Sequence, residues 1–502
     1  MTSFDEPAPE VIVPPSPQRR SVAVWGIGAL LMALFTTWTI GMPVFTSPDE
    51  AAHLFKAYGT AHGEWLGDLQ PGQSPNIRVF HMPQQMAPPD GPDDGLACYF
   101  GYPDRTADCA VGHDGVLAST AAVYPPFWYG VVGGAARITG QSTHQRAYRA
   151  ASAVLCAALI ALAFESARRS RQASLSPLLL IGLTPMAVFL AGTLNPNAFE
   201  IAGFVLAWSL VLHLPEPRAA TTRAGFVVGL LVAALLLSRF ASAVWVALGA
   251  LVAVTIVGFA RLRTLGWRFF APALGCTAAA LAALAAWTAY SGASADDPRT
   301  QVDWTTGHVI RETISRMPDM TEAMIGVLGW LDTPLPPIVH ILFAALSLTV
   351  LIGVVLSRNR RLVVATALVA SSLFAVPIAI NVISAENAGL IWQGRYSLPM
   401  FAALGVIGMI GWRDALDRMP RPVWEQTIRI GACAAFGVAE VISFWQALRR
   451  YTVGSDGKIW LSGSLPWQPG ITPMALIALN ATIVVGLCVV VLRSTRPPAP
   501  AG

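Results

Sequence analysis

The chain has 502 residues, of which 54% are hydrophobic and 12% charged, and its mean hydropathy is +0.55. A soluble globular domain carries about 25% charged residues, so this chain lacks the polar surface that a water-soluble fold needs. The net charge of +4 is negligible over this length and indicates no nucleic-acid partner. The composition predicts an all-α integral membrane protein whose first partner is the lipid bilayer.

The amino-terminal segment 1–21 is Pro-rich and contains no long apolar run, so it is predicted to be a disordered cytoplasmic tail. Arg19 and Arg20 then precede the apolar run 22–45, which is long enough to cross about 30 Å of hydrocarbon. No small-residue cleavage site follows this run. It is therefore expected to remain as an anchor with its amino end in the cytoplasm.

Eleven further apolar runs follow, which gives about twelve predicted spans in one transmembrane domain at 22–493 and a short cytoplasmic tail at 494–502. The runs lie at 146–166, 175–193, 198–214, 223–238, 241–260, 269–290, 336–356, 362–383, 397–412, 428–447 and 472–493. When the spans alternate in direction, six Arg clusters fall on the side of the amino terminus, as the positive-inside rule requires. Both termini are therefore predicted to be cytoplasmic.

The opposite side then carries two large loops, at 46–145 and 291–335. The segment 121–140 is apolar, but Tyr124-Pro125-Pro126 and a Gly pair interrupt it. We interpret it as a juxtamembrane helix on the outer face and not as a further span.

The first loop opens with the segment 47–58, SPDEAAHLFKAY. At about 100° per residue, Asp49, His53 and Lys56 fall on one stripe of a helix, and the large apolar side chains fall on the other face. This pattern predicts an amphipathic helix at the membrane surface. It would direct a carboxylate, an imidazole and an ammonium group into a common space above the bilayer.

Two interpretations of this motif remain open. Ser47 as the N-cap, Pro48 at the first helical position and Glu50 at the third would form a capping box, which needs no catalysis. Capping does not account for the polar stripe. A carboxylate on that stripe, Asp49, can instead act as a general base when burial and neighbouring groups tune its pKa.

Five motifs together carry a resemblance to a known family. They are PDExxH at 48–53 after the first span, YPP at 124–126, NPN at 195–197, GWLDT at 329–333 and QGRYxxP at 393–399. In order and spacing they resemble the bacterial multispanning proteins of the domain-of-unknown-function family DUF2142, over nearly the whole chain. That family is similar in turn to the GT-C superfamily of membrane glycosyltransferases.

The resemblance implies a polytopic GT-C-like bundle in a bacterial plasma membrane, with its active site on the extracytoplasmic side. It implies a transferase that takes a sugar from a polyprenyl-phosphate-linked donor and passes it to an extracytoplasmic acceptor such as a cell-envelope glycan. An acidic residue of the first loop would be the catalytic base. The match gives this role to Asp49, with Glu50 as an alternative or helper and His53 beside them, and a single displacement would invert the anomeric configuration.

The chain departs from the family pattern at one place. Where we expect Asn-Pro-Asp, it has Asn195, Pro196 and Asn197. If the family's Asp binds metal or substrate, that role is in doubt here or passes to Glu200, one turn along the helix. A divalent ion held by Asp49 with Glu50 or Glu200 remains an open alternative, because some GT-C relatives use a metal and others do not.

Arg395 is expected at the outer end of a span, where a guanidinium can fork onto a phosphate with two parallel hydrogen bonds. Its alternative role is that of an interfacial anchor in an aromatic belt with Tyr396. Further candidates for binding substrate or lipid phosphate are Lys56, Tyr124, Asn195, Asn197, Glu200 and Arg239. For Arg239, at a turn between two spans, an ordinary structural ion pair is an equally good interpretation.

Cys98 and Cys109 are the two cysteines that fall in a polar stretch, and the other four lie in apolar runs. Both belong to the loop assigned to the oxidising side, with ten residues between them in a turn-rich segment. We predict that they form a disulfide.

Two other functions stay open beside the transferase. The chain could be a transporter or flippase for a lipid-linked saccharide, or a non-catalytic protein of cell-envelope assembly. Transport places ionisable residues or broken helices near the bilayer midplane, whereas the polar candidates here concentrate in the outer loops.

Overall fold

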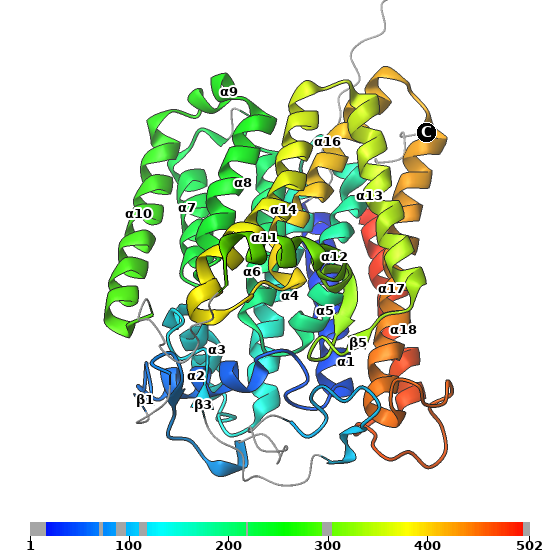
Figure 1. Cartoon of the computed structure of the whole chain (residues 1–502). Coiled ribbons are helices and arrows are strands. Elements are labelled where there is room, and N and C mark those ends of the chain that lie inside the picture. Colours follow the sequence, from blue (N-terminus) through cyan, green and yellow to red (C-terminus); the bar gives the residue numbers. More distant parts are fainter. Residues whose placement is uncertain are drawn as a thin grey trace, which may run out of the picture.

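The computed structural model describes residues 17–69, 74–86, 97–109, 118–216, 219–293 and 304–494, except for the side chains of 17–23, 85 and 387. The remaining parts of the predicted tails lie outside the described residues. The first helix begins at Pro17, within the segment 1–21 that was predicted to be the amino-terminal tail. The described chain is a bundle of long helices, with two short antiparallel sheets in the loops at one end (Figure 1).

The helices follow the apolar runs of the sequence. The α-helices are α1 (Pro17–Gly41), α2 (Glu50–Ala61), α3 (Pro126–Ile138), α4 (Gln145–Arg168), α5 (Pro185–Gly192), α6 (Pro196–Val211), α7 (Thr222–Leu236), α8 (Ser242–Val257), α9 (Phe259–Arg263), α10 (Gly266–Ser291), α11 (Thr306–Ser315), α12 (Met317–Gly326), α13 (Pro337–Ser357), α14 (Arg360–Ala388), α15 (Leu398–Phe401), α16 (Ala403–Arg418), α17 (Pro422–Val453) and α18 (Pro473–Ser494). The 3₁₀ helices are η1 (Gln84–Met86), η2 (Ala107–Cys109), η3 (Ala173–Gly182) and η5 (Gly394–Ser397).

Every predicted span contains a helix. Among the described residues, seven helices are long and apolar enough to cross a membrane, namely α1, α4, α10, α13, α14, α17 and α18. Three shorter apolar helices, α6, α7 and α8, accompany them. The chain is therefore a polytopic membrane protein, and twelve crossings remain a prediction.

The predicted continuous span at 175–193 is wrong in detail. Its place is taken by the 3₁₀ helix η3 and the α-helix α5, which are bent by 74° at the break between them. Pro185 causes the break, because a proline disfavours helical backbone in the residue before it and has no N–H to continue the ladder. Thr184 caps the new helix by accepting a hydrogen bond from the N–H of Ala187.

Polar side chains inside the bundle are joined between spans. The indole Nε1 of Trp38 on α1 donates to Glu440 on α17 at 2.6 Å. The amide of Asn480 on α18 donates to the hydroxyl of Thr37 at 2.9 Å. Such bonds hold α1 against both carboxyl-terminal spans, where a polar group without a partner would be costly.

The arginine-rich loops meet at one end of the bundle, which we call the arginine-rich end. Arg171 after α4 pairs with Asp417 of α16, and Arg361 of α14 donates to the carbonyl of Val257 at the end of α8 at 3.1 Å. This end also carries α9 and the carboxyl end of the described chain (Figure 1).

The first loop folds over the opposite end, which we call the loop end. It contributes α2, α3 and the three-stranded sheet of β1 (Asp68–Leu69), β2 (Arg78–Val79) and β3 (Ala118–Ser119). The antiparallel register pairs Asp68 with Val79 and Arg78 with Ser119. As predicted, the segment 121–140 forms a short helix, α3, which lies with α2 at this end (Figure 1).

The second loop adds α11, α12 and the hairpin of β4 (Val327–Leu328) and β5 (Thr333–Pro334). Helix α12 packs against η5 and α5, so this loop turns back into the bundle (Figure 1). Arg450 of α17 ties the two loops together: its guanidinium binds Asp332 at 3.0 Å and the carbonyls of Tyr99 and Tyr102 at 2.7 and 3.0 Å.

The structure confirms the predicted bond between Cys98 and Cys109. We expect mass spectrometry of unreduced protein to recover these two cysteines in linked peptides, while Cys276 is alkylated after unfolding. Because the bridge closes a short loop, reduction should lower the free energy of unfolding by about 2–3 kcal/mol. Finding both Cys98 and Cys109 alkylated without reductant would contradict the bridge and would also argue against an extracytoplasmic loop.

Candidate functional site

Asp49 lies at the loop end, immediately before the first residue of α2. Its backbone φ is 62°, in the left-handed region that only a few per cent of non-glycine residues adopt. Because Asp49 is not helical, α2 begins at Glu50, two residues later than the capping-box interpretation requires. The interpretation of Ser47 as the N-cap is therefore wrong. One of the two contacts of a capping box is present, since the N–H of Ser47 donates to the Glu50 carboxylate at 3.3 Å.

The carboxylate of Asp49 is 39% exposed and has one ionic partner among the described residues. Its Oδ2 accepts a hydrogen bond from Nη2 of Arg395 at 2.9 Å. The two residues are 346 positions apart in the chain. The structure therefore brings the predicted base and the predicted phosphate-binding arginine into direct contact.

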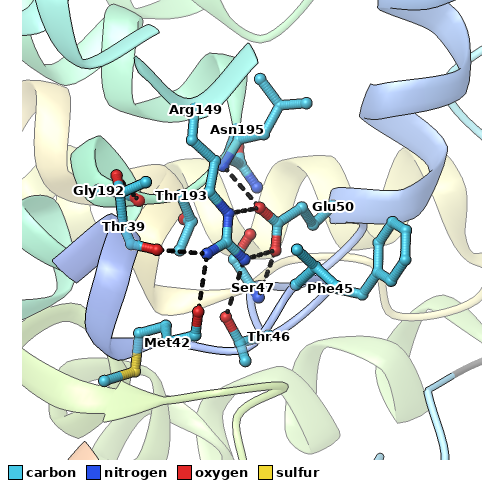
Figure 2. A network of polar contacts seen from close by, with 12 residues as sticks. Thr39, Met42, Phe45, Thr46, Ser47, Glu50, Arg149, Gly192, Thr193 and Asn195 are labelled. Atoms are coloured by element: carbon cyan, nitrogen blue, oxygen red, sulfur yellow. Dashed lines mark hydrogen bonds and ion pairs between the residues drawn. The ribbon is translucent and has the colours of Figure 1, made fainter. Parts of the chain in front are cut away.

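Glu50 belongs to a separate, buried network of polar contacts, shown in Figure 2. Its carboxylate forms a two-bonded pair with Arg149, with Nε on Oε1 at 2.6 Å and Nη2 on Oε2 at 2.8 Å. The backbone N–H of Leu194 adds a third donor at 3.0 Å. With Ser47 as the fourth, the Glu50 oxygens are fully occupied by donors.

Arg149 uses its remaining donors on backbone carbonyls at the end of α1 and just beyond it (Figure 2). They are those of Thr39, Met42 and Pro43, at 3.3, 3.1 and 2.6 Å. The network therefore fixes the chain that leads from α1 into α2. This geometry gives Glu50 a positioning task, because its carboxylate holds the turn in which Asp49 sits.

Asn195 contributes to the same turn from the start of α6. Its side-chain amide donates to the carbonyl of Pro48 at 3.0 Å, and its oxygen accepts from the N–H of Asn197 at 3.0 Å as the cap of α6. Pro48 immediately precedes Asp49. The NPN motif therefore holds the backbone on one side of Asp49, while Glu50 holds it on the other.

Arg395 lies on η5 with only 1% of its side chain exposed. Its Nη2 also donates to the hydroxyl of Tyr396 at 3.1 Å. Nε and Nη1 have no hydrogen-bond partner among the residues that the structure describes. A buried guanidinium with two unused nitrogens can receive an anion without releasing Asp49.

The glycine before Arg395 explains part of the QGRY motif. A Cβ on Gly394 would lie 2.0 Å from the carbonyl oxygen of Met320 and 2.7 Å from the N–H nitrogen of Met324. Only glycine lets η5 approach α12 this closely. The second loop thereby positions the arginine of the site.

Arg239 and Glu200 form a second ion pair beside the first. Nη1 of Arg239 binds Glu200 at 3.2 Å, and the hydroxyl of Ser242 and the amide of Asn197 complete the carboxylate at 2.7 and 3.0 Å. Asn197 stands where an Asp is expected in the family, and its side-chain amide binds Glu200, the carboxylate that was considered as a replacement for that Asp.

Tyr396 joins the two ion pairs. The guanidinium of Arg239 lies 4.6 Å from the centre of its ring and that of Arg395 lies 4.9 Å away. Cation–π attraction holds both cations on one aromatic ring. The site therefore gathers two positive charges, and two negative charges balance them.

His53 lies one turn along α2 from Asp49 and is buried. Its Nδ1 is hydrogen-bonded to the hydroxyl of Tyr129 at 2.9 Å, and the ring of Tyr124 lies 6.2 Å away. Burial, together with the positive charges of Arg239 and Arg395, lowers the pKa of His53 well below its usual value. The lowered pKa favours the neutral form of the imidazole.

Lys56 does not join the cluster, although the helical period predicted a common stripe. Its ammonium donates to the carbonyls of Trp65 and of Ala122, the latter at 2.7 Å, and lies 4.9 Å from the ring centre of Trp287. Burial lowers its pKa to about 7, with Arg78 adding to the effect. Lys56 therefore holds the backbone of the segment that leads to Tyr124. The expected open stripe above the bilayer does not form at this residue, because α2 packs against α3 and β3 and Lys56 is buried.

The described residues do not fit a divalent metal. Glu50 and Glu200 are occupied by N–H and O–H donors, which leaves Asp49 as the single candidate with an uncommitted oxygen. In this part of the chain no group of three His, Cys, Asp or Glu side chains could hold an ion. Magnesium and calcium need several oxygen ligands.

An apolar cavity of about 270 Å³ lies next to η5, between α12, α13, α14 and α15. Its lining includes Met320, Met324, Phe374, Phe401 and Ser397. Ser397 is two residues after Arg395, so the cavity reaches the segment that carries the arginine. It can hold a hydrocarbon chain close to the polar cluster.

Sequence reasoning missed three residues of the site: Arg149, Tyr129 and Ser242. Arg149 could have been found, since it is an arginine in the first turns of an apolar span, and such a residue needs a partner. Tyr129 and Ser242 carry no comparable signal, because a tyrosine in an aromatic segment and a serine at a helix start are ordinary.

Comparisons with known proteins agree with the membrane assignment. The model of the family described as "Predicted membrane protein (DUF2142)" matches residues 31–404. Two solved structures are similar, both of ArnT from Cupriavidus metallidurans: in the apo state, at 15% identity and a TM-score of 0.46, and bound to undecaprenyl phosphate, at 13% identity and a TM-score of 0.45. Each likeness covers 96% of this chain and 78% of that one. No curated protein matches the chain.

The Glu50–Arg149 pair predicts a large stability effect. Replacing one member alone, as in Glu50→Leu or Arg149→Met, should lower the free energy of unfolding by about 3–5 kcal/mol, because an unpaired charge is left buried. The double variant should be less destabilised than the sum, which a double-mutant cycle measures.

Asp417→Asn, at an exposed pair, is the control and should cost at most about 1 kcal/mol. Additive effects of the two single variants at the Glu50–Arg149 pair would show that the pair does not hold this turn.

Proposed function

We propose, from the premise that the chain belongs to the DUF2142 family of predicted membrane proteins, that it is a glycosyltransferase which moves a sugar from a polyprenyl-phosphate-linked donor to an acceptor hydroxyl. The similarity of that family to the GT-C superfamily of membrane glycosyltransferases implies the same activity. The observation that carries the proposal is the contact of Asp49 with Arg395, whose Nε and Nη1 have no partner among the described residues.

Arg395 is suited to hold the phosphate of the donor. Its buried guanidinium has two unused nitrogens, and a charge-assisted hydrogen bond to a phosphate oxygen is roughly twice as strong as a neutral one. The cavity beside η5 would take the start of the prenyl chain. An amphiphile with one anionic group and one apolar chain matches this combination.

Asp49 is suited to be the base. It is the one carboxylate of the described cluster with substantial exposure, and it is held on a fixed backbone by Glu50 and Asn195. It would take the proton of the acceptor hydroxyl while that oxygen attacks the anomeric carbon. The bond from the anomeric carbon to the phosphate oxygen breaks, the prenyl phosphate leaves on Arg395, and the configuration inverts.

The remaining polar residues would shape the site. Arg239 adds positive charge near the leaving phosphate and keeps Tyr396 in place. His53 and Tyr124 form a wall beside Asp49 in which burial raises the pKa of the Tyr124 hydroxyl, so that both groups stay neutral. If the arginine-rich end faces the cytoplasm, as the positive-inside rule predicts, the loop end with this site would face the outer side of a bacterial plasma membrane.

The first test concerns the base. Asp49→Asn keeps the size of the side chain but cannot accept the acceptor's proton, so the rate of transfer should fall by about 10²-fold or more. The measurement is consumption of a short-chain prenyl-phosphate sugar by purified protein in detergent, across a panel of hexoses and pentoses.

Asp68→Asn, an exposed carboxylate of the same loop, is the matched control and should leave the rate unchanged. Turnover of Asp49→Asn near the wild-type rate would remove the base assignment. If the wild type consumes no donor, a flippase becomes the better hypothesis, since detergent leaves no second compartment.

The second test concerns the phosphate. Lysine keeps the charge but offers a compact point donor in place of a planar fork, so Arg395→Lys should lower the rate by about 10–100-fold, and Arg395→Ala should lower it further. Arg316→Lys, at an exposed arginine, serves as the control.

An interfacial anchor would tolerate lysine, because either side chain can reach the headgroups. Full activity of Arg395→Lys would therefore exclude Arg395 from the site.

A further inference from the structure

A second hollow lies at the arginine-rich end, away from the site described above. It has a volume of about 560 Å³ and opens between the end of α4, the end of α6 and the start of α7. Its charged lining has both signs: Arg169 and Arg223 are exposed cations, and Glu165 and Glu216 are carboxylates. We call this hollow the vestibule.

The vestibule adjoins an apolar cavity between α6, α7 and α8, which we call the slot. The slot has a volume of about 240 Å³ and is lined by hydrophobic side chains and one glycine. The two cavities share Leu210, Leu214, Val228 and Phe269 in their linings. The slot is larger than the apolar cavity of roughly 150 Å³ that accepts a benzene molecule, and its walls offer water no polar partners.

The charges around the vestibule are partly committed to one another. Glu165 is held by Arg168 at 2.6 Å and Arg169 at 2.5 Å. Glu216 contacts His213 at 3.2 Å, and His213 reaches the carbonyl of Ser166 at 2.9 Å. The side chain of Arg169 nevertheless remains 64% exposed and that of Glu216 38% exposed, so each sign has a face open to a ligand.

We propose that the vestibule and slot bind one phospholipid with a primary ammonium in its headgroup, of the phosphatidylethanolamine class. One acyl chain fills the slot, the phosphate lies against Arg169 and Arg223, and the ammonium donates to Glu216. A headgroup with both charges matches a lining with both charges. An anionic glycerol headgroup offers Glu216 neutral hydroxyl donors but no positive charge, and a quaternary choline offers a charge but no N–H.

This lipid would support the proposed active site without taking part in it. Trp208 lines the slot, and its indole donates to the carbonyl of Pro399 at 2.9 Å. Pro399 follows Arg395 by four residues. A chain packed in the slot therefore stabilises α6 against the segment that carries the arginine. The inference does not depend on the transferase proposal, because lipid binding is measured directly.

The test is native mass spectrometry of delipidated full-length protein, titrated in detergent with dioleoyl phosphatidylethanolamine or dioleoyl phosphatidylglycerol. We expect one tightly held phosphatidylethanolamine and a weaker phosphatidylglycerol. Glu216→Gln should cost about tenfold in affinity for the ethanolamine lipid and leave the glycerol lipid unchanged, since a charge-assisted hydrogen bond is lost. Glu425→Gln, a carboxylate at the same end outside the vestibule, should change neither.

The slot is tested with Ala253→Phe, whose ring would occupy the slot between α6 and α8. It should abolish tight binding of both lipids, and lipid should no longer raise the midpoint of thermal unfolding. If this variant does not fold, Arg169→Gln with Arg223→Gln replaces it and should weaken both lipids by about tenfold or more. Equal affinity for the two headgroups in the wild type, or unchanged lipid binding in the variants, would overturn the proposal.

Discussion

The buried ion pair of Glu50 and Arg149 is the interaction on which the loop end depends. It joins the end of α1, the start of α2, the first turns of α4 and the turn before α6 in one network of hydrogen bonds. A pair so deeply buried loses much of its Coulomb gain to desolvation, but its geometry is specific and all of the carboxylate's donors are in place. Its value to the protein is the fixed backbone that it creates.

That fixed backbone explains how Asp49 can keep an unusual conformation. A left-handed aspartate costs free energy, and it persists only where the surroundings over-determine it. The residues on either side of Asp49 are held, Pro48 by Asn195 and Glu50 by Arg149, so Asp49 itself needs no structural bond of its own. Its carboxylate is left for Arg395. Structural rigidity and chemical availability are thus divided between neighbouring acidic residues.

The same division appears between the two arginines. Arg239 is committed to Glu200, which Ser242 and Asn197 also bind, whereas Arg395 keeps two nitrogens without a partner among the described residues. Tyr396 holds both cations on one ring, and of the two carboxylates that pair with them only Asp49 is substantially exposed. Such an arrangement suits a ligand that brings its own negative charge. The glycine of the QGRY motif is needed for a steric reason: η5, which carries Arg395, lies so close to α12 that a Cβ at this position would clash with its backbone.

The sequence by itself determined the membrane class, the helical segments and the disulfide, because hydropathy and the position of each cysteine can be read directly along the chain. The order of the motifs also singled out Asp49 and Arg395 as the residues for which the roles of base and phosphate ligand are proposed. The tertiary structure alone decided that Glu50 pairs with Arg149 and that Lys56 binds backbone carbonyls apart from the cluster of polar side chains around Asp49. Both outcomes involve partners that are distant in the chain, since Arg149 lies 99 positions from Glu50 and Ala122 lies 66 positions from Lys56. A helical period tells which side chains share a face, but which protein groups meet that face is settled only when the spans pack together.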